Sequence, residues 1–380
     1  MRHGIAKQWL KAVLITALLT YAIPPEWNSI PAYALSSSSS NSSYVASTAE
    51  IQQKLIEGLE ARQNTITIKF KGKTKNLEKI LKQAMRDALD QDPYTKYIVD
   101  RYSYSWRGTS STAKINFQVY YRESVEQSAY VNKRVEGILI SIVQPEMNNH
   151  QRIKAIHDYV VKNLKYDEDL QKYTAYEGLR TGEAVCQGYS LLTYQLLKTA
   201  GFASLIVEGT AGGQAHAWNL VLLDGKWYHL DTTWDDPLSN GPEQVRYDYY
   251  LRTDNEMKVD HKWTKKYPAA STLYRETLRL LSSKDGSEKG VYTALEEQLG
   301  YSLYYADAAV SNGVGLQEKV KQSITFGKET VTVRYTGNEN QLIKDLSMLY
   351  NLDLADIRYS ARPLEGTKDL RVEIFWRTLN

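Results

Sequence analysis

Residues 216–237 read HAWNLVLLDGKWYHLDTTWDDP and carry the strongest local fold signal in the chain. Two apolar runs flank an Asp-Gly pair, the dipeptide that favours a two-residue turn between antiparallel strands. With that turn, Trp218 lies opposite Asp231. Because opposed residues and residues two apart share a face of a sheet, His216 and Asp231 are predicted to be diagonal neighbours.

A histidine beside a carboxylate has a specific chemical use. If Asp231 accepts a hydrogen bond from one ring nitrogen of His216, the tautomer is defined and the other nitrogen is free to act as a base. His229 shares the predicted face with Asp231 and competes for the same role. We expect His229 to be a strand residue near the site and His216 to be the base.

The chain has a single cysteine, Cys186, in the stretch GEAVCQGYS at residues 182–190. The following residues have the apolar spacing of a helix that Gly201 ends, so Cys186 lies at or just before its first turn. Helix N-terminal amides and a histidinium partner both stabilise a thiolate, the useful nucleophile. The alternative is a buried, inert cysteine. We predict a nucleophile, with the site order Cys186, His216, Asp231.

The chain resembles the transglutaminase-like superfamily, and in particular its secreted bacterial members, in the motifs GEAVCQGYS, HAWNLV and WYHLDTTWDDP. The resemblance extends from the helix around His157 to HKWTKKYP near Tyr267. It implies an α+β fold with a papain-like cysteine-enzyme core, whose nucleophile helix packs against an antiparallel sheet. It also implies that Cys186 is the nucleophile, His216 the base and Asp231 the orienting residue.

The sequence departs from the animal members of this superfamily next to the cysteine. Gln187 stands where those enzymes have a tryptophan, and no equivalent of their separate oxyanion tryptophan is identifiable. The backbone amide of Cys186 is one candidate oxyanion donor, with Tyr166 or Gln187 as the second. Trp218 and Trp234 are candidates for the walls of a substrate cleft, or for plain core packing.

No metal or cofactor is expected from the sequence. One cysteine and scattered histidines give no ligand cluster, and no calcium-loop pattern occurs. Asn219 is expected to be structural, and His157 to pack in the core or lie on the surface. Asp235 and Asp236 precede a proline and are expected to be turn residues.

The ends of the chain predict export and a spacer. Residues 1–34 have a basic start, a short apolar run and a small-residue cleavage site, which predict a signal peptide. Residues 35–48 form a Ser/Asn-rich spacer. We expect a secreted protein, free or associated with the cell wall, with no stable membrane span after cleavage.

Two segments of the chain resemble one another. Residues 316–346 align without a gap with residues 51–81, so that Gly72 falls on Gly337, and two predicted strands follow each segment. The alternative is chance similarity between two helix–strand segments. We predict two small related α/β modules that flank the core.

These observations divide the chain into six parts. After the signal peptide and spacer come an N-terminal α-β-α-β-β module (49–144), a catalytic domain (145–275), a linker (276–313) and a C-terminal module (314–380).

Composition narrows the function classes. The net charge of +3 is weak, and no basic run with interleaved aromatic residues suggests nucleic-acid binding. The predicted partners are a protein or peptide substrate and, as an alternative, cell-envelope polymers. Three functions remain open: a transglutaminase-like acyltransferase that cross-links proteins, a cysteine peptidase or amidase acting on cell-envelope peptides, and a non-enzymatic envelope-binding protein.

Overall fold

The computed structural model describes residues 44–236 and 245–378, and it has the expected mixture of helices and strands in an α+β fold. The predicted signal peptide and residues 35–43 of the predicted spacer lie outside these ranges. Within them, no helix is long and apolar enough to cross a bilayer.

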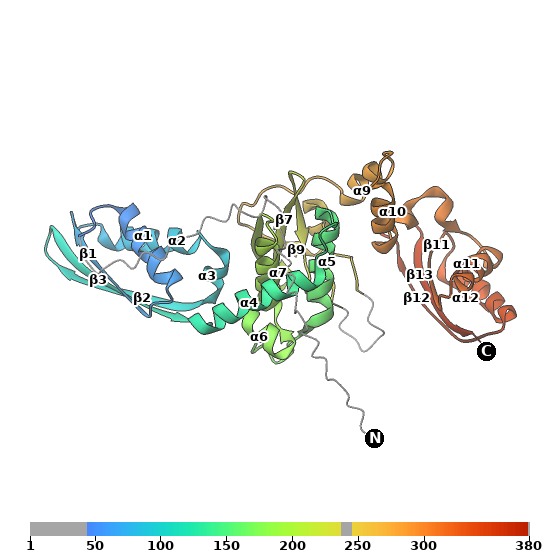
Figure 1. The fold of residues 1–380 in the computed structure, drawn as a ribbon, viewed down its shortest axis with the longest axis horizontal. Helices are drawn as coiled ribbons and strands as arrows, with labels where there is room; N and C mark the ends of the chain where they lie inside the picture. Colours follow the sequence, from blue (N-terminus) through green and yellow to red (C-terminus); the bar gives the residue numbers. More distant parts are fainter. Residues whose placement is uncertain (1–43, 237–244, 379–380) are drawn as a thin grey trace, which may run out of the picture. The chain divides into compact units, whose positions relative to one another are not determined.

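The N-terminal module is a three-stranded antiparallel sheet in the order β1-β3-β2, with helices α1 and α2 packed along it (Figure 1). Apolar residues alternate along β1 and β3, so one face of the sheet is buried against the helices. The elements are α1 Thr48–Glu60, β1 Thr65–Lys71, α2 Leu77–Leu89, β2 Val99–Gly108 and β3 Thr112–Tyr121.

The predicted spacer ends earlier than residue 48. Val45 is buried and pairs with Phe70 beside β1, through backbone hydrogen bonds to Lys69 and Lys71. Ser47 then caps α1 in a reciprocal capping box with Glu50. The apolar Val45 and the capping serine tie the last residues of the Ser/Asn tract to the module.

The predicted boundary at residue 144 is also wrong. Two helices before it, α3 (Pro93–Ile98) and α4 (Val125–Ile142), place their apolar residues in the core of the central domain. Their buried side chains there are Tyr94, Ile98, Val131, Val135 and Ile138. The apolar stripe of α4 repeats at helical spacing and is covered by the central helices, so α4 belongs to that domain.

The central domain is built on a four-stranded antiparallel sheet in the order β8-β7-β6-β9 (Figure 1). Helix α7 packs against β6 and β7. The elements are α5 Asn149–Asn163, β4 Lys165–Tyr166, α6 Ala175–Thr181, β5 Glu183–Ala184, α7 Cys186–Thr199, β6 Ser204–Ala211, β7 Gln214–Leu223, β8 Lys226–Leu230, α8 Asp254–Met257 and β9 His261–Lys262.

The hairpin β7–β8 has the predicted turn and, over part of its length, the predicted register. Asp224 and Gly225 both have positive φ, as the two-residue turn requires, and Leu220 pairs with His229. The expected pairs beyond Leu230 do not form, because β8 ends there. The backbone N–H of Asp231 instead donates to the carbonyl oxygen of Tyr249, and the chain turns away from the sheet.

The segment 276–313, expected to be a linker, is largely structured. It contains most of α9 (Tyr274–Ser282), α10 (Lys289–Gln298), two short 3₁₀ helices (Tyr301–Tyr304 and Ala306–Ala308) and β10 (Ala309–Val310). Leu278, Tyr292 and Leu295 are buried in the central core. The polar stretch at 283–288 is only the connection between two helices whose apolar faces are covered.

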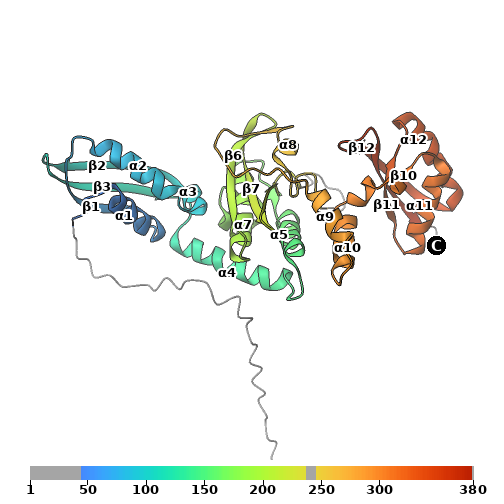
Figure 2. The same ribbon diagram turned by 90° about the horizontal axis from the view of Figure 1, so that it is seen from above.

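The C-terminal module repeats the element order of the N-terminal one. Its sheet has the order β10-β11-β13-β12, in which β11-β13-β12 matches β1-β3-β2, and α11 and α12 pack beside it (Figure 2). The further elements are α11 Gly313–Thr325, β11 Thr330–Tyr335, α12 Glu339–Leu346, a 3₁₀ helix Ser347–Leu352, β12 Leu354–Pro363 and β13 Leu370–Thr378.

The aligned glycines of the two modules have the same surroundings. A Cβ on Gly72 would lie 2.7 Å from the ring of Phe70, and one on Gly337 would lie 2.5 Å from the ring of Tyr335. In both modules an aromatic side chain therefore covers the glycine two residues after it. A common origin of the modules stays a prediction that this shared contact favours.

Gly188, in the first turn of α7, provides a test of how closely that helix packs against the residues before it. A Cβ there would lie 2.6 Å from the side chain of Ala184 and 3.1 Å from the carbonyl oxygen of Thr174. We expect Gly188→Ala to lower the free energy of unfolding by about 1–3 kcal/mol, because the added methyl overpacks a closed contact. Urea unfolding measures the change.

The matched control is Gly137→Ala in α4, where a Cβ would meet nothing within 4 Å. Since alanine is the better helix former, this variant should gain about 0.5–1 kcal/mol. Equal effects of the two substitutions would contradict the close approach at Gly188.

Candidate active site

Cys186 is the first residue of α7 and is half-buried with a free thiol. Val185 precedes the helix without a side-chain cap. The first amides of a helix have no intrahelical partner, so they are available to a charge that develops beside the thiol. The structure therefore confirms the prediction that Cys186 lies at the start of a helix.

Two side chains join the start of α7 to β7. The hydroxyl of Ser190 donates to the carbonyl oxygen of Ala217 at 2.8 Å, and the amide of Asn219 donates to the carbonyl oxygen of Ser190 at 3.1 Å. Ala217 follows His216 directly. Asn219 is structural, as expected, and its contact holds the helix that carries Cys186 against the strand that carries His216.

His216 lies between the thiol and a carboxylate. Its Nε2 is 2.7 Å from Oδ2 of Asp231, and Cys186 is near enough to raise its pKa. Burial alone lowers the pKa of His216, but the charge and hydrogen bond of Asp231, together with Cys186, outweigh it and raise the pKa to about 10. The imidazole is thus protonated at neutral pH, beside the thiol.

Asp231 is fully buried and accepts four hydrogen bonds. Its Oδ1 accepts from the backbone N–H groups of Thr233 and Trp234, and its Oδ2 faces His216 and a second histidine, His261. Burial alone would raise the pKa of Asp231, but these histidines hold it well below its usual range. The carboxylate is therefore a buried anion surrounded by donors.

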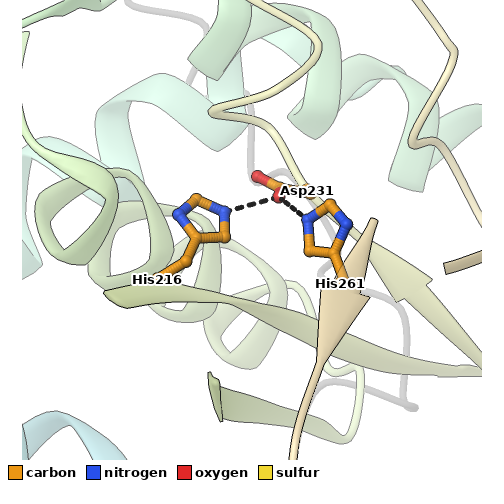
Figure 3. Close-up of side chains that lie close together, drawn as sticks. All are labelled: His216, Asp231 and His261. Carbon is orange, nitrogen blue, oxygen red and sulfur yellow. Dashed lines mark hydrogen bonds and ion pairs between the residues drawn. The ribbon is translucent and has the colours of Figure 1, made fainter. Parts of the chain in front are cut away.

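His261 was not identified from the sequence. It lies in β9, where it pairs with Ala211 of β6. Its Nε2 is 3.1 Å from Oδ2 of Asp231 (Figure 3). Its Nδ1 is 2.6 Å from Oδ1 of Asp260. Only the pairing of β9 with β6 brings it to the site, and no local pattern in the sequence predicts that pairing.

The remaining sequence candidates take different positions. Tyr166, in β4, pairs with Ala184 two residues before the cysteine, and burial and then the nearby Cys186 raise its pKa. Within residues 44–236 and 245–378 its hydroxyl has no hydrogen-bond partner. Gln187 instead donates its side-chain amide to the carbonyl oxygen of Tyr97 at 3.0 Å. Tyr166 therefore fits an oxyanion donor better than Gln187 does.

The two tryptophans cover the histidines. Trp218 is buried and stacks on His216 with ring centroids 5.8 Å apart. Trp234 is half-buried and lies 4.7 Å from the ring of His261. Trp218 is therefore a core residue that also packs on His216. Trp234 packs on His261, the other histidine bonded to Asp231.

His229 does not compete for the base role. Its Nδ1 accepts from the indole of Trp218 at 2.9 Å, and its Nε2 lies 3.0 Å from Asp254. Burial lowers its pKa. His229 therefore links Trp218 of β7 to Asp254 of α8 next to the site.

His157 and Asp235 do more than the sequence suggested. Both are fully buried, and Nε2 of His157 is 3.0 Å from Oδ2 of Asp235. Burial raises the pKa of Asp235 to about 6. The N–H of Asp235 donates to the carbonyl oxygen of Asp231, and Asp236 accepts from Tyr189 of α7. These buried pairs hold the turn that carries Asp231.

The ligating atoms of His216, Asp231 and His261 lie within 4.8 Å of one another, as those of a metal site can. Here, however, both imidazole nitrogens are directed at the same carboxylate oxygen, at hydrogen-bond distances of 2.7 and 3.1 Å. In this arrangement the two imidazoles are hydrogen-bonding partners of the carboxylate.

A helix-terminal thiol next to a buried His–Asp pair is the arrangement of enzymes that form thioester intermediates. Residues 137–232 match the model of the transglutaminase-like superfamily. The central domain of this chain belongs to that superfamily.

Individual relatives are distant. The chain is 24% identical over 159 residues to the human kyphoscoliosis peptidase and 25% identical to the mouse protein, covering 37% of this chain and 24% of each relative. It thus spans about a quarter of the length of these relatives. The crystal structure of a TGase shows 13% identity and a TM-score of 0.28, over 64% of this chain and 74% of the other.

The buried pair predicts a pH dependence of stability. The pKa of His216 rises from its ordinary 6.5 to about 10, so its contribution is complete below pH 6.5 and is lost as pH rises through about 10. The pKa of Asp231 falls below its ordinary 3.8, so its contribution is lost only in strong acid. We expect Asp231→Asn to cost about 3 kcal/mol near pH 5 and less at pH 10.

Urea unfolding from pH 5 to pH 10 measures this difference. The matched control is Asp254→Asn, which removes a carboxylate from His229, whose pKa is lowered. A cost of Asp231→Asn that stays constant up to pH 10 would contradict the ion pair.

Proposed function

We propose that this chain is a secreted cysteine-dependent acyltransferase that acts on protein amide groups and cross-links proteins in the manner of transglutaminases. The observation that carries this proposal is the bond of His216 to the buried Asp231, together with Cys186 at the start of α7, near enough to raise the pKa of His216. Nucleophile, proton donor and orienting carboxylate each have a geometry that suits their role.

In the first half-reaction, the thiolate of Cys186 attacks the carbonyl carbon of a carboxamide. The N–H of His216 that is not bonded to Asp231 protonates the departing nitrogen, which leaves as ammonia or an amine. Asp231 keeps His216 in the orientation that this transfer needs. The product is a thioester on Cys186 and a neutral His216.

In the second half-reaction, His216 takes a proton from the incoming amine or water, which attacks the thioester and releases Cys186. The oxyanion of each tetrahedral intermediate would lie at the start of α7, where the amide of Cys186 is one donor. The hydroxyl of Tyr166 is the second candidate donor, because its strand pairs with Ala184 just before α7 and Cys186 is near enough to raise its pKa.

A pocket of about 210 Å³ lies between α3, β6 and residues 265–268. Tyr97 lines it, and the carbonyl oxygen of Tyr97 accepts from Gln187, the residue after the nucleophile. Apolar side chains form part of the pocket, and Lys96 and Glu208 pair at its edge. We propose that the residues flanking the substrate amide lie along this pocket.

Hydrolysis is the second candidate. Transfer to water uses the same nucleophile and base, and the distant mammalian relatives are named as peptidases. On this alternative the protein is a peptidase or amidase that acts on cell-envelope peptides. The third candidate, a non-enzymatic envelope-binding protein, would not need the buried His–Asp pair.

Export and the partners are part of the same proposal. The predicted signal peptide supports a secreted or wall-associated enzyme whose partners are protein or peptide substrates, with envelope polymers as a further candidate.

A labelled primary amine distinguishes these functions. We expect the parent protein to attach the amine to a glutamine-rich protein such as casein and to release ammonia, and Cys186→Ala and His216→Asn to lose both by at least about 1,000-fold. Fluorescence of the separated casein and an ammonia assay give the two readouts. His150→Gln, which changes a buried histidine bonded to Tyr274 and Asp224, is the folding control.

The outcomes separate the three candidates. Ammonia or peptide release without amine attachment would establish hydrolysis and exclude cross-linking. Iodoacetamide tests the binding alternative: in an enzyme, the parent thiol should react well below pH 8 and His216→Asn should slow it. A slow reaction, equal in both proteins, would favour the envelope-binding protein.

The oxyanion assignment has its own test. We expect Tyr166→Phe to lower kcat about 100-fold with little change in KM, because the lost hydroxyl would bind the transition state and not the substrate. Gln187→Ala is the control, since its amide already bonds Tyr97. Steady-state kinetics of amine attachment or ammonia release measure both, and the reverse order of effects would make Gln187 the donor.

A further inference from the structure

His261 is a buried histidine with a carboxylate at each end of its ring. Its side chain is fully buried, Nε2 lies 3.1 Å from Oδ2 of Asp231, and Nδ1 lies 2.6 Å from Oδ1 of Asp260. Asp260 is partly exposed and also accepts from the hydroxyl of Tyr249 at 2.6 Å. The two imidazoles meet at one oxygen atom of Asp231 (Figure 3).

This geometry determines where the protons are. A neutral imidazole has one N–H and one lone pair, and a lone pair facing a carboxylate oxygen is repelled. Both contacts of His261 are hydrogen bonds only when both ring nitrogens carry protons. His261 is then a second cation on the carboxylate that holds His216.

We propose that His261 is a positioning residue that shares Asp231 with His216 and weakens the hold of that carboxylate on the proton of His216. This inference rests on the proposed function, because it assigns His261 a part in the proton transfers of that reaction. It acts through Asp231 and does not touch the substrate or the thiol.

Charge explains why a second cation helps. A fully buried carboxylate facing one histidine alone would bind that proton so tightly that His216 would be a poor acid toward the leaving nitrogen. His261, with its polar atoms within 4.8 Å of those of His216, opposes the protonated state of His216 by like-charge repulsion. It also occupies the remaining hydrogen-bonding position on Oδ2, so the carboxylate keeps its orientation.

The other groups around His261 do not supply this charge. The polar and titratable side chains that face His261 are Asp231, His216, His229, Tyr249 and Asp260. Asp231 follows β8, His216 lies in β7 and His229 lies in β8. Tyr249 lies in the segment before α8, and Asp260 directly precedes β9. Apart from His216, whose proton is the one affected, they are two carboxyl groups, a phenol and His229, whose pKa burial lowers.

The test is the pH dependence of Cys186 alkylation by iodoacetamide from pH 4 to pH 11, which needs no substrate. The alkaline inflection of this profile reports loss of the proton from His216, which changes the charge beside Cys186. We expect His261→Gln, which can keep a donor to Asp231 but loses the charge, to move that inflection upward by about one pH unit. Asp260→Asn, at a partly exposed position, should move it in the same direction by less.

Further measurements separate positioning from general stability. His150→Gln should leave the inflection where the parent has it while lowering the unfolding midpoint by an amount similar to His261→Gln. In an assay of amine attachment or ammonia release, His261→Gln should lower kcat at pH 7 about tenfold with KM unchanged.

Two results would overturn the proposal. An alkaline inflection equal to that of the parent in both His261→Gln and Asp260→Asn would mean that His261 has no electrostatic effect on His216. A downward shift would mean that His261 holds Asp231 in place without sharing its charge. If instead His216→Asn leaves the parent profile unchanged, the Cys–His pair of the proposed function itself fails.

Discussion

The buried charge of Asp231 is the constraint on which the rest of the site depends. An isolated carboxylate with no exposed surface would be very costly, so every lone pair needs a donor. The donors come from β7, from β9 and from the turn after β8. The neighbouring β7 and turn after β8 must therefore meet the more distant β9 at one carboxylate, and the sheet order β8-β7-β6-β9 provides that meeting.

The same constraint extends into the helical layer. The turn that carries Asp231 is held by Asp235 against His157 of α5 and by Asp236 against Tyr189 of α7. Because α7 also carries Cys186, the thiol and the carboxylate are held by one set of buried polar contacts. A change in this turn would disturb the orientation of His216 and the seating of α7 together, so chemistry and stability are coupled here.

Local sequence patterns predicted the parts of the site that lie close together in the chain. The Asp-Gly turn defined the hairpin register near the turn, and the apolar spacing after Cys186 located the start of α7. His216 and Asp231 were expected to meet as diagonal neighbours in a ladder, but they meet because the chain leaves the sheet after Leu230 and turns back. The proximity was right, and its structural cause was different.

Long-range packing decided what the sequence could not. Nothing local to His261 indicates that β9 pairs with β6, and nothing in the polar loop at 283–288 indicates that the helices around it complete the central core. The sequence by itself determined the turn, the helix start, the repeated order of elements and the resemblance that names the superfamily, because these depend on neighbours in the chain. Only the tertiary structure decided the second histidine on Asp231, the buried His157–Asp235 pair and the domain boundaries, because burial and charge pairing depend on which distant segments cover each residue.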